Sequence, residues 1–222
     1  MIPMTGGRAG KLIVVEGIDG AGKSTQVRRL AKLLLERGYS VVTSREPTDG
    51  PWGRKLRESA SSGRMTIDDE LHAFLEDRRE HVATLIAPAL ERGDVVLLDR
   101  YYFSTMAYQG IRGADVAGIR AANETFAPRP DLVLLLDFDP RTAIKRISES
   151  RGDVPNEFEK LENLEAIRRI FLETAQGDAT FRIVDGNGTP DEVFERLSAA
   201  ALSLLLPREG GGGPDEGRTA VG

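Results

Sequence analysis

The chain of 222 residues contains no cysteine and only two histidines, His72 and His81. Without cysteine there is no disulfide, no thiolate nucleophile and no cysteine-based zinc site. Two histidines are also too few for a histidine-rich metal centre. These absences exclude thiol chemistry and make a histidine-based metal site implausible.

Long apolar runs and basic blocks are absent as well. No run approaches the roughly 20 apolar residues that span a bilayer, and the first ten residues lack the apolar core of a signal peptide. The net charge is −5, without a cluster of lysines and arginines, which argues against a nucleic-acid partner. We expect a cytoplasmic protein that binds neither membranes nor nucleic acid.

Short apolar runs alternate with helical patterns along the chain. The predicted strands span residues 11–15, 39–44, 94–98, 131–136 and 180–184. The predicted helices span residues 24–36, 71–90, 114–125, 141–148, 158–175 and 190–205. This alternation predicts an α/β fold with a doubly wound parallel sheet flanked by helices on both faces. We expect one domain over residues 11–206, with a flexible N-terminus at 1–10 and a disordered glycine-rich tail at 207–222.

The stretch that follows the first predicted strand fits the pattern G-x-x-x-x-G-K-S and opens a predicted helix. In that context the glycines let backbone N–H groups turn onto phosphate oxygens, and the helix N-terminus adds partial positive charge. Lys23 would reach the β- and γ-phosphates, and the Ser24 hydroxyl would bind Mg²⁺. The expected nucleotide-binding residues are Gly17, Ile18, Asp19, Gly20, Ala21, Gly22, Lys23, Ser24 and Thr25.

Asp99 closes the buried run of residues 95–98. An aspartate in this place is what a P-loop enzyme uses to hold Mg²⁺, so Ser24 and Asp99 are the predicted metal ligands. An ordinary strand-end turn is the alternative. Arg100 adjoins Asp99 and is a candidate ligand for a phosphate oxygen.

Within the predicted helix 71–90, Phe74 and Arg78 fall on one apolar face, one turn apart. A guanidinium on an apolar face is costly without an anionic partner, so this pair could stack a base and hold a phosphate. A core phenylalanine beside an arginine that reaches the surface is the alternative.

Several arginines stand near the predicted site, namely Arg45, Arg78, Arg100, Arg146 and Arg151. Transfer to a hydroxyl generally needs a base near the nucleophile. A phosphate monoester has a second pKa of about 6 and is already ionised near neutral pH. Arginines that bring two polyanions together therefore favour a nucleoside monophosphate as the acceptor.

Taken together, these motifs resemble the thymidylate kinase family. The segments that carry the resemblance are residues 16–25, 45–47, Phe74 with Arg78, 99–101 and 104–109. The resemblance implies a five-stranded parallel sheet, a homodimer, and Mg²⁺-dependent phosphoryl transfer from ATP to dTMP, giving dTDP in dTTP biosynthesis.

The resemblance also implies roles for single residues. Phe74 would stack on thymine, and Asp19 would contact the sugar of the acceptor. Tyr108 would sit near C2′ and disfavour a ribose. The remaining residues implied to bind dTMP are Arg45, Arg78, Arg100, Ser104, Thr105 and Gln109.

Some family members carry a P-loop arginine where this chain has Gly20. A lid at about residues 148–158 would then supply the catalytic arginine beside Lys23 and Arg100, with Arg151 preferred and Arg146 as the alternative. By position, residues 185–188 would form the adenine loop. The alternative functions are a kinase for another nucleotide or deoxynucleoside, and a P-loop switch without a metabolic acceptor.

Overall fold

The computed structural model describes residues 10–151 and 160–205. The expectations for the N-terminus at 1–9, for the part of the lid from 152 onward and for the glycine-rich tail lie outside these residues. No helix of the described part is long and apolar enough to cross a membrane.

The sheet has five parallel strands in the order β2-β3-β1-β4-β5. The strands are β1 Lys11–Glu16, β2 Val41–Arg45, β3 Val95–Asp99, β4 Leu132–Asp137 and β5 Phe181–Asp185. Every strand predicted from the sequence is confirmed, with ends displaced by one or two residues. The central strands β1, β3 and β4 are almost wholly buried, as expected for strands covered on both faces.

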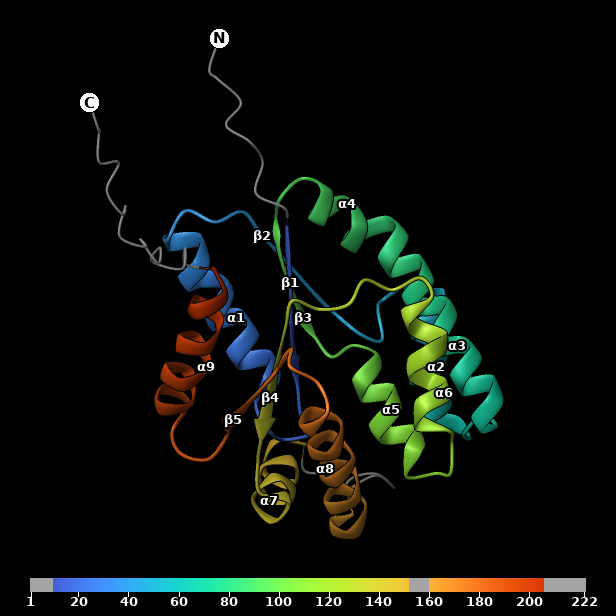
Figure 1. The fold of residues 1–222 in the computed structure, drawn as a ribbon. Helices are drawn as coiled ribbons and strands as arrows, with labels where there is room; N and C mark the ends of the chain where they lie inside the picture. Colours follow the sequence, from blue (N-terminus) through green and yellow to red (C-terminus); the bar gives the residue numbers. More distant parts are fainter. Residues whose placement is uncertain (1–9, 152–159, 206–222) are drawn as a thin grey trace, which may run out of the picture.

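Helices connect the strands and cover both faces of the sheet. They are α1 Lys23–Glu36, α2 Pro51–Ser62, α3 Ile67–His81, α4 Ala87–Glu91, α5 Tyr102–Gly110, α6 Val116–Glu124, α7 Pro140–Arg151, α8 Leu161–Gln176 and α9 Pro190–Leu205. A π-helical turn, η1 Val82–Ile86, joins α3 to α4. In Figure 1, α1 and α9 lie on one side of the sheet, and α2 to α6 lie on the other.

The helices α2 and α5 have no counterpart among the helices predicted from the sequence. All residues of α5 from Tyr102 to Gln109 are buried, so this helix shows no polar stripe that would reveal its period. The helix α2 begins with Pro51 at its first turn, which is a favourable start, but its surface is dominated by charged residues. The predicted helix 71–90 begins earlier than expected because Thr66 caps α3, its side chain accepting a hydrogen bond from the Asp69 amide at 3.2 Å.

The strand register gathers polar side chains at the carboxyl edge of the sheet. Val15 of β1 is level with Asp99 of β3, and Arg45 of β2 is level with the same Asp99. Glu16, the last residue of β1, is level with Leu135 of β4. Because ligands of open α/β sheets bind beyond this edge, the fold places the glycine loop after β1 at the middle of the expected site.

The glycine loop packs closely on the start of α7. Gly20 has a φ of +79°, and a Cβ atom at this position would lie 2.8 Å from the Ala143 carbonyl oxygen. Gly22 has a φ of +91°, but a Cβ atom there would meet no other atom within 4 Å. The backbone of α7 therefore leaves no room for a side chain at Gly20.

This difference predicts the stability of two matched variants. Both Gly20→Ala and Gly22→Ala place a side chain in a left-handed conformation, at a cost of about 1–2 kcal/mol each. Only Gly20→Ala adds the contact with Ala143, which we expect to cost roughly 1–3 kcal/mol more. Urea unfolding of both variants measures the difference, and equal losses would contradict this packing argument.

Candidate active site

The glycine loop leads into α1 without a side-chain cap. Gly22 is the N-cap residue and adopts a left-handed conformation, and no side chain accepts a hydrogen bond from the first turn. The amides of Thr25 and Gln26 donate to the Gly22 carbonyl oxygen at 3.1 and 3.2 Å. These bonds engage the amides from Thr25 onward, and the amides of Lys23 and Ser24 at the very start of α1 are left facing the loop, an arrangement that suits an anion such as phosphate.

The amine of Lys23 is buried beneath this loop, with 6% of the residue exposed. It donates hydrogen bonds to the carbonyl oxygens of Gly17 at 3.0 Å and Ile18 at 2.8 Å. Burial, together with the nearby charge of Arg100, lowers the pKa of Lys23 to about 8. A phosphate in the loop would favour the charged amine.

Ser24 and Asp99 meet across the gap between the glycine loop and β3. The Ser24 hydroxyl donates a hydrogen bond to the Asp99 carboxylate. Within residues 10–151 and 160–205, no group of three or more histidine, cysteine, aspartate and glutamate side chains could hold a metal ion. One hydroxyl and one carboxylate are oxygen ligands of the kind that Mg²⁺ prefers when water and phosphates complete its shell. The two residues thus fit the predicted metal site.

Beside the glycine loop lies a cavity of about 200 Å³, which we call the arginine cavity. Eight of the nine residues predicted to bind the acceptor line it. They are Asp19, Phe74, Arg78, Arg100, Ser104, Thr105, Tyr108 and Gln109. Since these residues come from the glycine loop, α3 and the segment after β3, the fold assembles them from distant parts of the sequence.

Arg78 lies in the wall of this cavity and is only 1% exposed. Its guanidinium donates to Glu46 Oε2 at 2.8 Å, to Asn123 Oδ1 at 2.5 Å and to Thr105 Oγ1 at 3.3 Å. Glu46 in turn contacts His81, with Oε1 2.9 Å from Nδ1. The alternative in which Arg78 reaches the surface is therefore wrong, because an anionic partner holds it inside.

Arg100 follows Asp99 with a φ of +72°, in the left-handed region. Its guanidinium contacts the Asp19 carboxylate and donates to Ser104 Oγ at 3.0 Å. The Tyr108 hydroxyl donates to Asp19 Oδ2 at 3.0 Å. Arg100 and Tyr108 thus meet on the aspartate of the glycine loop, where that loop borders the arginine cavity.

The turn that carries Arg100 is held by Glu16, which is completely buried. Glu16 accepts hydrogen bonds from the Tyr101 amide at 2.8 Å, the Ser104 amide at 3.2 Å and the Ser104 hydroxyl at 2.6 Å. Burial raises the pKa of Glu16 to about 7, although these hydrogen bonds oppose the shift. Glu16 therefore fixes the turn between β3 and the start of α5.

Arg45 is the predicted acceptor-binding residue that the structure does not bring into the cavity. Its side chain is 63% exposed and pairs with Asp49 at 2.9 Å. Side chains alternate along a strand, so an outward Arg45 is followed by an inward Glu46. This alternation is the sequence signal that could have identified Glu46 as a buried residue of the site. Arg57 of α2 lines the cavity instead, donating to the carbonyl oxygens of Pro47 and Thr48 at 3.0 and 2.7 Å. It was missed because α2 was not predicted.

A second cavity, of about 260 Å³, lies on the other side of the glycine loop, and we call it the P-loop cavity. Arg146 lines it together with Gly186 and Gly188 of the predicted adenine loop. The Arg146 guanidinium also lies 4.2 Å from the centre of the Phe138 ring. Arg151 is the last residue of α7, and its side chain lies outside the described residues, so its predicted catalytic role stays a prediction.

Comparison with known proteins agrees with this geometry. A family model described as thymidylate kinase matches residues 15–197. The chain belongs to the thymidylate kinase family.

Relatives named thymidylate kinase match over most of their length. One from Akkermansia muciniphila is 51% identical over 204 residues, which cover 91% of this chain and 96% of the relative. One from Xanthomonas campestris is 50% identical over 199 residues, covering 90% and 86%. The resemblance inferred from the motifs is thereby confirmed, and so is the α/β fold with its five-stranded parallel sheet.

The pKa of Lys23 predicts how ATP binding depends on pH. When the pH is below the pKa of about 8, the Lys23 amine is charged and attracts phosphate. When the pH is above this pKa, the amine becomes neutral. We expect the affinity for ATP to fall as the pH rises through about 8. Calorimetric titration across this range measures the effect, and Lys23→Ala should bind ATP weakly with little dependence on pH. A wild-type affinity that stays constant through this range would contradict the assignment.

Proposed function

We propose that the protein transfers the γ-phosphoryl group of ATP to dTMP with Mg²⁺, giving dTDP for dTTP biosynthesis. The observation that carries the proposal is the place of Asp19. It belongs to the phosphate-binding loop, yet its carboxylate contacts Arg100 and Tyr108 in the arginine cavity. One residue thus joins a donor site to an acceptor site, as transfer between two bound nucleotides requires.

ATP is bound on the glycine-loop side. Its phosphates lie on the first amides of α1, and Lys23 stabilises the charge of the transferring group. Ser24 and Asp99 hold the Mg²⁺, which neutralises phosphate charge when it is bound. Adenine lies in the P-loop cavity beside Arg146, whose guanidinium offers a flat face for stacking.

The acceptor is bound in the arginine cavity. Thymine stacks on Phe74 and meets Arg78, Thr105 and Gln109, while the phosphate lies at Arg100. Tyr108, held by Asp19, faces the sugar and disfavours a 2′-hydroxyl. No base is needed, because the acceptor phosphate is ionised near neutral pH, and His81 is engaged by Glu46 and Ser44 at 2.9 and 2.8 Å.

The protein is also proposed to act as a homodimer, as the resemblance to thymidylate kinases implies. A cavity of about 620 Å³ opens between α3 and α6, lined by apolar side chains such as Leu71, Leu75 and Ile119. This face offers apolar surface to a second copy. Light scattering measures the molar mass in solution, and a monomeric mass at assay concentrations would contradict this part of the proposal.

A coupled assay of ADP release tests the function. ATP and Mg²⁺ are supplied with dTMP, dUMP, UMP, CMP, AMP or thymidine in turn. We expect the highest kcat/KM with dTMP, and Lys23→Ala should lose activity on the order of a hundredfold or more while remaining folded. Preference for another acceptor would identify a different kinase, and hydrolysis that is independent of any acceptor would indicate a nucleotide switch.

Replacing Phe74 separates acceptor binding from donor binding. Stacking of a base on an aromatic ring contributes about 1–3 kcal/mol, so Phe74→Ala should raise the KM for dTMP roughly fivefold to 150-fold and leave the KM for ATP almost unchanged. Phe126→Ala is the control, since Phe126 is also partly buried beside an arginine, 4.1 Å from Arg79, but lies outside the arginine cavity. Equal losses for both substrates would place Phe74 in the core rather than on the base.

A further inference from the structure

A third acidic residue of the arginine cavity, Glu70, has no role in the proposed reaction. Glu70, Phe74 and Arg78 follow one another at intervals of four residues along α3, so they share one face, and all three line the cavity. The Glu70 side chain is only 5% exposed. A buried carboxylate is costly unless it is paired, so its partners explain its presence.

Two arginines from different segments contact Glu70. Arg64, in the connection between α2 and α3, places Nε 3.5 Å from Oε1. Arg112, in the turn after α5, contacts Oε2 through Nη1. Arg64 itself lines the arginine cavity, so Glu70 also holds a cationic side chain at the cavity wall.

The turn that carries Arg112 is a direct extension of α5. The amides of Arg112 and Ala114 donate to the Gln109 carbonyl oxygen at 3.0 and 3.2 Å, and the Gly113 amide donates to Gly110 at 3.0 Å. Displacement of Arg112 would therefore be passed to Gln109, which lines the arginine cavity together with Phe74.

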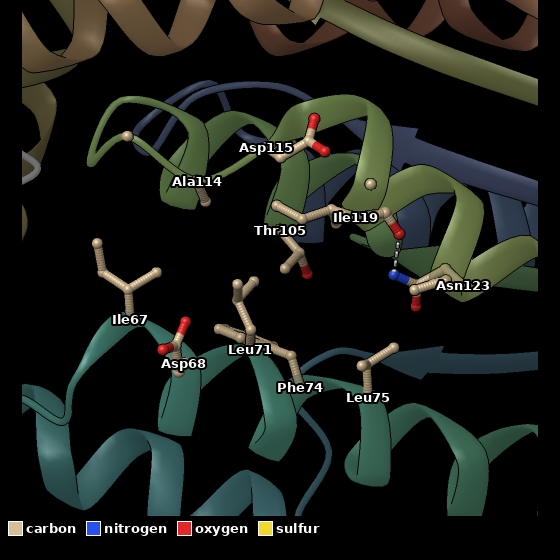
Figure 2. Close-up of a pocket in the computed structure, with 13 residues that line it drawn as sticks. Ile67, Asp68, Leu71, Phe74, Leu75, Thr105, Ala114, Asp115, Ile119 and Asn123 are labelled. Carbon is tan, nitrogen blue, oxygen red and sulfur yellow. Dashed lines mark hydrogen bonds between the residues drawn. The ribbon is translucent and has the colours of Figure 1, made fainter.

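Beside the arginine cavity, a larger cavity separates α3 from α5 and α6. Figure 2 shows Leu71 and Phe74 of α3 facing Thr105, Ala114 and Ile119 across the cavity of about 620 Å³ between α3 and α6. Phe74 and Thr105 line this cavity and the arginine cavity alike, so within one copy of the chain a cavity separates the two walls on either side. The contact between Glu70 and Arg112 spans these walls at one end of α3.

We propose that Glu70 is a positioning residue for the acceptor, setting the separation between the wall of Phe74 and the wall of Thr105 and Gln109. This inference rests on the proposed function, because it takes the arginine cavity as the acceptor site. Position 70 needs a carboxylate because its negative charge is the counter-ion of two arginines. Without it, Arg64 and Arg112 lose their common counter-ion, repel each other, and release both walls.

Steady-state kinetics with paired variants test the proposal. In Glu70→Gln, in Arg112→Met and in the double variant, the KM for dTMP should rise about fivefold or more, while the KM for ATP changes by less than about twofold. The double variant should be no worse than the more impaired single variant, because both changes break one contact. Arg112→Met leaves Glu70 paired with Arg64. If Glu70→Gln fails to fold, Arg112→Met therefore still tests the proposal.

Arg120→Met is the matched control. It breaks an ion pair of similar burial, between Arg120 and Asp178 at 2.5 Å, and neither residue lines the arginine cavity. This variant should lose stability yet keep its KM for dTMP within about twofold of the wild type. A smaller rise in the Glu70 and Arg112 variants, an equal rise for ATP, or the same rise in Arg120→Met would overturn the proposal.

Hydrogen exchange distinguishes failure of this inference from failure of the proposed function. The amides of Gly113 and Ala114 should exchange faster in nucleotide-free Arg112→Met than in the wild type, and as slowly in Arg120→Met as in the wild type. This measurement needs no substrate. Unchanged exchange in Arg112→Met would overturn the inference alone, whereas a wild-type protein without activity on dTMP would overturn the proposed function and, with it, the role of Glu70 toward the acceptor.

Discussion

The site depends on one buried carboxylate at the end of β1. Glu16 accepts hydrogen bonds from the Tyr101 amide and from the amide and hydroxyl of Ser104, and so holds the turn between β3 and α5. Arg100 within this turn adopts a φ of +72°, a conformation that costs on the order of 1–3 kcal/mol for a residue with a side chain. Because Glu16 stabilises the turn, Asp99 faces Ser24 while Arg100 faces Asp19. One turn therefore serves the donor side and the acceptor side.

The arginines of the cavity share a common arrangement. Arg78 pairs with Glu46, Arg100 with Asp19, and Arg64 with Glu70, and each acid comes from a different segment of the chain. Buried ion pairs add little net stability, because desolvation cancels much of the attraction. Their benefit lies in geometry, since a guanidinium held by an acid is already oriented before the ligand arrives. The acids thus keep several cations in a small space and offset their mutual repulsion.

The sequence predicted much of this architecture, and the failures have physical causes. The central strands β1, β3 and β4 were recognisable because strands buried on both faces are continuous apolar runs. The glycine loop and Asp99 were predicted because their patterns are tied to phosphate and metal binding, and the structure brings Phe74 to the cavity beside this loop. The helix α5 was missed because its burial hides its period, and Arg57 was missed with α2. Arg45 was placed in the site through its position at a strand end, but its side chain points to solvent and binds Asp49. The ion pairs with Glu46 and Glu70 join distant segments, so no local pattern indicates which arginine pairs with which acid.

A crystal structure with dTMP, a non-hydrolysable ATP analogue and Mg²⁺ tests the central claim most directly. We expect thymine against the Phe74 ring, the dTMP phosphate at Arg100, the metal ion between Ser24 and Asp99, and Asp19 between the two nucleotides. Binding of dTMP in the cavity between α3 and α6 would contradict the account. So would an acceptor phosphate that makes no contact with Arg100.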